Sequence, residues 1–226
     1  DGAKFTDSAT SGTTHTITPT GSFHSQNHGG IASAMTFPAS GKLTGSAGVY
    51  FDGNGDYLQV FNFSETLSNS WSFEFYFYLS EVGRNNGLLY MTDVSGSSGW
   101  LRLRVSTANK LAFWADDNAS QWNIASNQEG SAVFSANTWY HLLFVHDTAP
   151  STNTYKIFIE GSTSADISVS SNTNIANTPD ELMIGYTEDS SDYLKGYIDS
   201  FRWHSSALTA GSTAKPTKIY GAYRSQ

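Results

Sequence analysis

The chain has 226 residues, no cysteine, 14% aromatic residues, only 14% charged residues and a formal net charge of −8. This length suits a single all-β domain with a large core, and so few charges argue against a fold built on salt-bridged helices. The negative charge and scattered basic residues argue against nucleic acid and anionic membranes as partners, and the missing cysteines exclude disulfides, thiolate zinc sites and cysteine nucleophiles.

The first 46 residues are rich in Ser, Thr and Gly, and they contain only two short strand candidates, at 15–18 and 31–37. We therefore expect a segment that wraps the edge of the domain. No run of 18 apolar residues occurs, so the sequence predicts no membrane insertion. The start at Asp1, without a signal peptide, suggests a mature or excised piece of a longer chain.

Residues 49–60 hold a turn rich in Gly, Asn and Asp between two short runs of strand-forming residues. Because Gly53 and Gly55 can take positive φ, residues 52–56 predict the bend of a hairpin. The turn also opens like an EF-hand loop, but Tyr57 and Phe63 stand where that loop needs Gly and Glu. An EF-hand is thus excluded, and Asp52 stays one candidate calcium ligand.

Residues 71–78 alternate between phenylalanines on one face and Glu74, Tyr76 and Tyr78 on the other. Residues 100–105 and 110–114 repeat this pattern, with aliphatic residues inward and arginine or tryptophan outward. Three successive strands are therefore predicted to present aromatic and basic side chains on one outer face.

Such an outer face can bind sugars, which stack on aromatic rings and exchange hydrogen bonds with charged and amide groups. The loop that carries Asp116, Asp117 and Asn118 is expected to adjoin it. Alternatively, a second sheet or a neighbouring subunit covers the face. The candidate ligand-binding residues are Tyr76, Tyr78, Arg102, Arg104, Trp114 and Trp122.

Residues 139–146 are apolar on both faces, which is typical of a central strand covered on each side. His141 and His146 lie on opposite faces of this strand and are expected to be structural histidines. Further short strands are predicted at 155–160, 182–185 and 196–203. Many short strands separated by turns predict an all-β, antiparallel two-sheet sandwich.

In the last of these strands, Asp199 shares alternation with Tyr197, Phe201 and Trp203, which predicts a carboxylate on a core-facing aromatic side. A buried carboxylate needs backbone donors, an arginine or a cation. The sequence therefore predicts either a calcium site centred on Asp199 or a carboxylate that accepts backbone N–H bonds.

Several landmarks follow one another in a defined order. They are Phe51-Asp52-Gly53, Asp56-Tyr57-Leu58, Trp71-Ser72-Phe73-Glu74-Phe75, Trp139-Tyr140-His141, Tyr155-Lys156-Ile157-Phe158-Ile159-Glu160-Gly161, Ile184-Gly185, Gly196-Tyr197-Ile198-Asp199-Ser200-Phe201-Arg202 and Ala207-Leu208-Thr209. Over roughly residues 1–209 the chain resembles the laminin-G-like members of the concanavalin A-like lectin and glucanase superfamily. Its opening, Asp1-Gly2 with Phe5-Thr6-Asp7-Ser8, is similar to tandem modules in structural and adhesion proteins of marine bacteriophages and bacteria.

The resemblance implies a jelly roll of two curved antiparallel sheets that binds glycans or other surface ligands, that has no catalytic activity in most members and that often holds calcium. In that family a structural calcium often ties the N-terminal loop to the last strand, which implies Asp7 and Asp1 as ligands beside Asp199. We expect one jelly-roll domain over residues 1–212 with an N-terminal wrapping segment. Residues 213–226 are expected to be a tail or a linker to a following module.

Catalysis is not expected. The related glucanases place two or three acidic residues close together on one strand, whereas Glu74 is alone on its strand and Asp116 and Asp117 are adjacent. No G-x-S-x-G motif of a serine hydrolase occurs.

The sequence thus favours a non-catalytic, lectin-like module of an extracellular or virion-surface adhesion protein. Its partner would be a glycan. One alternative is a structural module of a phage tail, fibre or capsid decoration that contacts a partner structural protein, as an oligomer or in tandem. The other is a glycan-active enzyme.

Overall fold

The computed structural model describes residues 16–20, 49–61, 63, 65–92, 99–117, 121–149, 151–175, 179–187 and 192–210. Within these residues every regular element is a strand and none is a helix, which confirms the predicted all-β class. No helix of the described residues is therefore long and apolar enough to cross a membrane.

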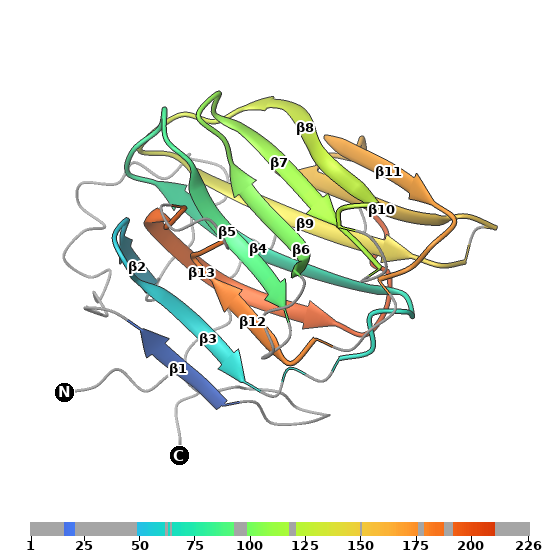
Figure 1. The fold of residues 1–226 in the computed structure, drawn as a ribbon. Helices are drawn as coiled ribbons and strands as arrows, with labels where there is room; N and C mark the ends of the chain where they lie inside the picture. Colours follow the sequence, from blue (N-terminus) through green and yellow to red (C-terminus); the bar gives the residue numbers. More distant parts are fainter. Residues whose placement is uncertain are drawn as a thin grey trace, which may run out of the picture.

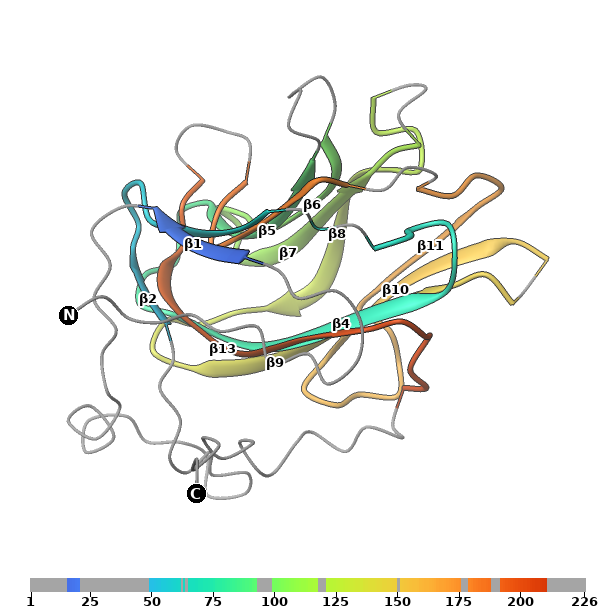
Figure 2. The ribbon, with the colours of Figure 1, turned by 90° about the horizontal axis from the view of Figure 1, so that it is seen from below.

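The strands form two sheets that stack face to face, as Figure 1 and Figure 2 show. All strand pairs are antiparallel, so the predicted two-sheet jelly-roll sandwich is confirmed. The seven-stranded sheet has the order β1 (Thr16–Thr20), β3 (Tyr57–Phe61), β12 (Glu181–Ile184), β5 (Asn86–Thr92), β6 (Gly99–Val105), β7 (Lys110–Ala115) and β8 (Ala125–Val133). The six-stranded sheet has the order β11 (Ile167–Ser171), β10 (Asn153–Ile159), β9 (Trp139–Asp147), β4 (Trp71–Leu79), β13 (Lys195–His204) and β2 (Val49–Asp52).

The core lies between the sheets and is filled by alternate residues of both. Phe73 on β4 stacks on Phe144 of β9 at 4.9 Å between ring centroids, and Phe113 of the opposite sheet meets Phe144 edge-on at 5.2 Å. These arrangements suit the charge distribution of aromatic rings. β9 lies between β10 and β4, as its apolar pattern predicted.

The turn at residues 52–56 joins the two sheets and does not close a hairpin, so this prediction was wrong. β2 before the turn pairs with β13, whereas β3 after it pairs with β1 and β12. The turn chemistry is as expected, since the Asn54 N–H donates to Asp52 Oδ1 at 2.7 Å and the Asp52 N–H to Asp56 Oδ2 at 3.2 Å. Turn residues specify a chain reversal but not which sheet receives the next strand.

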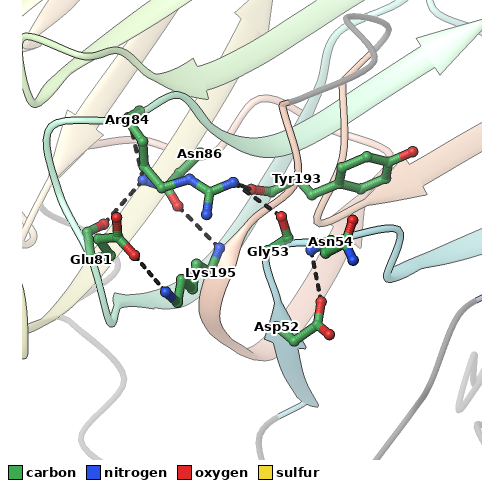
Figure 3. A network of polar contacts seen from close by, with 8 residues as sticks. All are labelled: Asp52, Gly53, Asn54, Glu81, Arg84, Asn86, Tyr193 and Lys195. Atoms are coloured by element: carbon green, nitrogen blue, oxygen red, sulfur yellow. Dashed lines mark hydrogen bonds and ion pairs between the residues drawn. The ribbon is translucent and has the colours of Figure 1, made fainter.

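A basic side chain supports this corner (Figure 3). Arg84 Nη2 donates to the carbonyl of Gly53 at 3.0 Å and to that of Tyr193 at 3.4 Å. Gly53 has φ of 87°, and a Cβ there would lie 2.6 Å from Arg84 Nη1, so the approach depends on glycine. The Arg84 guanidinium thus lies beside the corner for which the sequence suggested a metal ion.

A β-bulge changes the orientation of β13 half-way along. Asp199 pairs with Tyr76, but Arg202 pairs with Glu74, so three steps on β13 face two on β4. Ser200 takes up the extra residue with φ of 54°. Tyr197 and Asp199 consequently face outward, whereas Phe201 and Trp203 pack against the core. The prediction that all four share a core-facing side was wrong, because alternation holds only up to the bulge.

The last described residues lie against the outer face of the six-stranded sheet. Ser72 Oγ donates to the Ser206 carbonyl at 2.7 Å and accepts from the Leu208 N–H at 3.3 Å. In this segment Ala207, Leu208 and Ala210 pack on a cluster formed by Leu143, Val145 and Phe158. The proposed tail at 213–226 lies outside the described residues, and so does the predicted wrapping segment at 1–46 apart from strand β1.

Candidate functional site

The structure divides the predicted ligand-binding residues between two opposite outer faces. Tyr76 and Tyr78 lie on β4 of the six-stranded sheet, whereas Arg102, Arg104 and Trp114 lie on β6 and β7 of the seven-stranded sheet. The prediction of one continuous face was wrong because β4 and β5 are consecutive in the chain but belong to different sheets.

On the six-stranded sheet, the outer aromatic residues pack on one another. Tyr76 and Tyr78 are 2% and 8% exposed, and they form a cluster with Trp139 and Tyr197. Tyr78 donates its hydroxyl to Asn137 Oδ1 at 2.9 Å, and its ring lies 5.5 Å from that of Trp139. Burial raises the pKa of both tyrosines. These rings are therefore packed, not displayed.

Beside this cluster, Glu74 accepts hydrogen bonds from three basic side chains. Its carboxylate lies 3.0 Å from His141 Nε2, 3.1 Å from Arg202 Nη1 and 3.4 Å from His204 Nε2. Burial alone would raise the pKa of Glu74, but the bonds from the histidines and the charge of Arg202 outweigh it and lower this pKa to about 2. Glu74 is therefore ionised at neutral pH.

On the seven-stranded sheet, five directly paired residues form a row across β3, β12, β5, β6 and β7. The row is Gln59, Met183, Tyr90, Arg102 and Trp114. Its partly exposed members are Gln59 and Met183, at the β3 end. Trp114 is only 6% exposed.

Two guanidinium groups pack on the Trp114 ring. The Arg102 guanidinium carbon lies 4.3 Å from the ring centroid and that of Arg104 lies 4.8 Å from it. Arg104 also forms an ion pair with the buried Asp192. Cation–π contacts of this kind stabilise the positions of both partners, so the buried Trp114 ring orients the Arg102 and Arg104 side chains on this face.

Trp122 also has its ring close to the Arg102 guanidinium and is partly exposed. Its ring centroid is 5.4 Å from the Arg102 guanidinium carbon. Its φ is 55°, a left-handed conformation that is costly for a bulky residue and that the surroundings must enforce.

The hydrogen bonds of the loop between β7 and β8 enforce this conformation. The Trp122 N–H donates to Asp116 Oδ2 at 3.4 Å, and the Ile124 N–H donates to the Ala115 carbonyl at 3.1 Å. Asn123 bonds twice to Asp117, at 2.8 and 3.1 Å. The loop thus displays one tryptophan, with charged and amide groups beside it.

Three tyrosines that the sequence did not single out as ligand candidates lie close together, Tyr57 on β3 and Tyr186 and Tyr193 on the connection between β12 and β13. Tyr57 stacks on Tyr186 at 5.3 Å between ring centroids, and Tyr186 lies 4.8 Å from Tyr193. All three are partly exposed. Alternation around Leu58 and Val60 indicates that Tyr57 faces outward, but no local signal predicts its meeting with residues more than a hundred positions away.

The described residues do not form a calcium site by themselves. Asp199 is partly exposed and accepts from Ser200 Oγ at 3.1 Å, and Asp52 is exposed within its turn. Asp1 and Asp7 lie outside the described residues. Within the part of the chain that the structure describes, no three His, Asp or Glu side chains are grouped to hold a metal ion.

The sequence matches a laminin-G family model, described as the concanavalin A-like lectin/glucanases superfamily, over residues 52–212. The chain belongs to this family. The match includes the bulged strand β13 and the loop that carries Trp122. No curated protein sequence matches the chain.

Solved structures with this fold include several extracellular binding domains. A structure of botulinum neurotoxin type C, whose cell entry depends on interaction with two ganglioside molecules, is 14% identical with a TM-score of 0.61. The match covers 92% of this chain and 47% of the neurotoxin chain, so the chain spans about half the length of that relative.

Domain 4 of an extracellular arabinanase from Geobacillus stearothermophilus, in complex with arabinotriose, is 13% identical with a TM-score of 0.60. That match covers 90% of this chain and 87% of the arabinanase domain. A heptameric pentraxin from Limulus polyphemus is also 13% identical, with a TM-score of 0.50 and coverage of 74% and 82%. At these identities the likeness shows the shared fold.

Proposed function

We propose that this domain is a non-catalytic glycan-binding module and that it binds sugars on the outer face of the seven-stranded sheet, around Trp122. The observation that carries the proposal is the strained, hydrogen-bonded loop that displays Trp122 over Arg102. A conformation that costs energy and is nevertheless enforced is typical of functional positions.

The chemistry of this face suits a sugar. The Trp122 ring offers an apolar platform for the C–H face of a sugar ring. Asp117 and Asn123 lie beside it and can exchange hydrogen bonds with hydroxyl groups, and Arg104 can donate them. Because the loop is already braced, little conformational freedom would be lost on binding.

The structural relatives support the same class of ligand. Two of them are described with ganglioside or arabinotriose as their ligands. We extend this ligand class to the present chain, and we propose that the domain is part of an extracellular or virion-surface protein.

Binding is favoured over hydrolysis by the state of Glu74. A glycosidase needs one carboxyl group that is protonated and can act as the acid. The pKa of about 2 keeps Glu74 ionised, and its three basic neighbours already occupy its oxygens. Asp116 is committed to the Trp122 loop.

The proposal is tested on a glycan array with the purified domain, with and without calcium. Wild-type protein is expected to bind at least one glycan, and Trp122→Ala to lose about tenfold or more in affinity, since truncating a central aromatic contact typically costs more than 1 kcal/mol. Because Trp122 is partly exposed, the melting temperature of the Trp122→Ala variant should differ little from that of the wild type. Tyr50→Ala, a partly exposed tyrosine of the opposite sheet, is the matched control and should bind normally.

An array that stays blank under both conditions would contradict the proposal. Tight self-association of the purified domain in light scattering, together with a blank array, would instead favour the structural module of a phage tail, fibre or capsid decoration.

Calcium at Asp199, with Asp1 and Asp7, is a further proposal that rests on the family resemblance, because Asp199 is not core-facing. If it is correct, a chelator lowers the melting temperature and Asp199→Ala removes this effect. An unchanged melting curve, in protein shown by elemental analysis to hold no metal, would contradict it.

A further inference from the structure

We propose that Tyr57, Tyr186 and Tyr193 form a second sugar subsite, and that the ligand is an extended neutral oligosaccharide that reaches from these tyrosines to Trp122. This inference rests on the proposed function, which it narrows to a ligand class.

The tyrosine cluster joins strand β3 to the connection between β12 and β13. The rings of Tyr57 and Tyr186 stack at 5.3 Å with 30° between their planes, and those of Tyr186 and Tyr193 lie 4.8 Å apart at 30°. An antiparallel bridge pairs the backbones of Tyr186 and Tyr193. Arg84 holds the Tyr193 carbonyl, and Figure 3 shows the Tyr193 ring pointing away from that contact. The rings are thus fixed and partly exposed, as a stacking platform requires.

The cluster and Trp122 lie on the same outer face. On strand β3, Tyr57 alternates with the buried Leu58 and Val60, so its side chain points away from the core. It shares this outer face with Gln59, which belongs to the row across the sheet. The sheet order β3, β12, β5, β6 and β7 places four interstrand spacings of roughly 4.8 Å, about 19 Å in total, between the strands that carry Tyr57 and Trp114. This span is too long for a single sugar ring and suits a chain of several.

The face between the two aromatic sites carries polar side chains that could form hydrogen bonds with the oligosaccharide. In the row that crosses the sheet, Tyr90 and Arg102 are buried, whereas Gln59 and Met183 are partly exposed. Arg104 is also partly exposed, so Gln59 and Arg104 are the polar side chains that a sugar could reach. Asp192, next to Tyr193 in sequence, pairs with Arg104. The charges of this ion pair cancel, and the protein carries a net charge of −8. The surface therefore favours a neutral oligosaccharide over a polyanionic one.

The test uses neutral arabino-, xylo- and gluco-oligosaccharides, each from the disaccharide to the hexasaccharide, and measures affinity by calorimetry. For the series that binds, we expect affinity to rise about tenfold from disaccharide to hexasaccharide as the second platform is reached. Tyr193→Ala and Tyr57→Ala should remove this rise and leave disaccharide binding unchanged, whereas Trp122→Ala should weaken every length. Tyr50→Ala is the matched control and should keep the rise, and melting temperatures verify that each variant is folded.

The outcomes separate the two claims. A series that binds with Trp122 dependence but equal affinity at every length would overturn the extended ligand and leave the proposed function standing. Length dependence that survives both tyrosine variants would overturn the second subsite. Failure of every series to bind, with a blank glycan array, would overturn both.

Discussion

His141 and His146 lie on opposite faces of β9 and illustrate how one strand places the same residue type in two environments. His141 bonds Glu74 on the outer face, at 3.0 Å. His146 is fully buried in the core, where its ring stacks on Tyr155 at 4.5 Å and its Nδ1 lies 2.9 Å from the Asn69 carbonyl. Both are structural residues, as the sequence predicted, but each is bonded through one ring nitrogen only, since His141 Nδ1 and His146 Nε2 are buried without a hydrogen-bond partner among the described residues.

The buried His146 makes stability depend on pH. Burial lowers the pKa of His146 to about 4, despite the hydrogen bond to Asn69, while an unfolded histidine titrates near 6.5. The folded pKa is depressed, so the stabilisation is complete above about pH 6.5 and is lost as the pH falls toward 4. The expected loss is about 3 kcal/mol in the free energy of unfolding.

Urea unfolding of the wild type and of His146→Phe between pH 7 and pH 4 measures this effect. The variant keeps an aromatic ring between Tyr155 and Trp71 but has no group that titrates there. The free energy of unfolding of the wild type should therefore fall by about 3 kcal/mol relative to that of the variant as the pH falls from 7 to 4. Parallel pH profiles for wild type and variant would show that His146 does not carry the dependence.

At the scale of the strand, the bulge at Ser200 decides which side chains of β13 enter the core. Before the bulge, Tyr197 joins the outer aromatic cluster, and after it Trp203 stacks on Trp71 at 4.9 Å between ring centroids. Because the bulge inserts one extra residue, the residues beyond it face the side opposite to the one that unbroken alternation from Tyr197 would give them.

Two variants of Ser200 test this account. Ser200→Gly should leave the free energy of unfolding unchanged or raise it by up to about 1 kcal/mol, because glycine adopts a φ of 54° without steric cost. Deleting Ser200 removes the extra residue of the bulge, so Phe201 would pair with Phe75, and Phe201 and Trp203 would still face the core. We therefore expect the deletion variant to fold, with the pairing of Arg202 and Trp203 unchanged. Thermal unfolding monitored by circular dichroism reads both changes, and a deletion variant that fails to fold would argue that Ser200 is not the extra residue of the bulge.

These elements also mark the limit of what the sequence predicts. Alternation located most strands and the apolar phenylalanines of β4, because burial of one sheet face imposes a period of two. It did not show the bulge, which depends on the backbone of a single serine. The turn at Asp52 was likewise recognised as a turn, while its role of joining two sheets depends on pairing partners far along the chain.

At the scale of the molecule, the two outer faces differ in character. On the six-stranded sheet, Tyr76, Tyr78 and Tyr197 are buried and Glu74 is bonded within a basic cluster. On the side of the seven-stranded sheet, Trp122 and three tyrosines are partly exposed. The sequence correctly predicted a sandwich with aromatic side chains outside the core. It could not assign those side chains to separate sheets, because sheet membership is set by long-range pairing. Trp122 was named as a candidate, but only the structure shows it braced by Asp116 and Asn123.

The assignment of glycan binding to one face can be tested through the indole N–H resonances of the six tryptophans. Trp122 and Trp114 lie on the seven-stranded sheet, Trp139 lies on the opposite outer face, and Trp71 is in the core. In two-dimensional NMR titration with an oligosaccharide that binds on the array, we predict that the Trp122 and Trp114 signals shift while those of Trp139 and Trp71 stay in place. A shift of Trp139 with Trp122 unchanged would contradict the account.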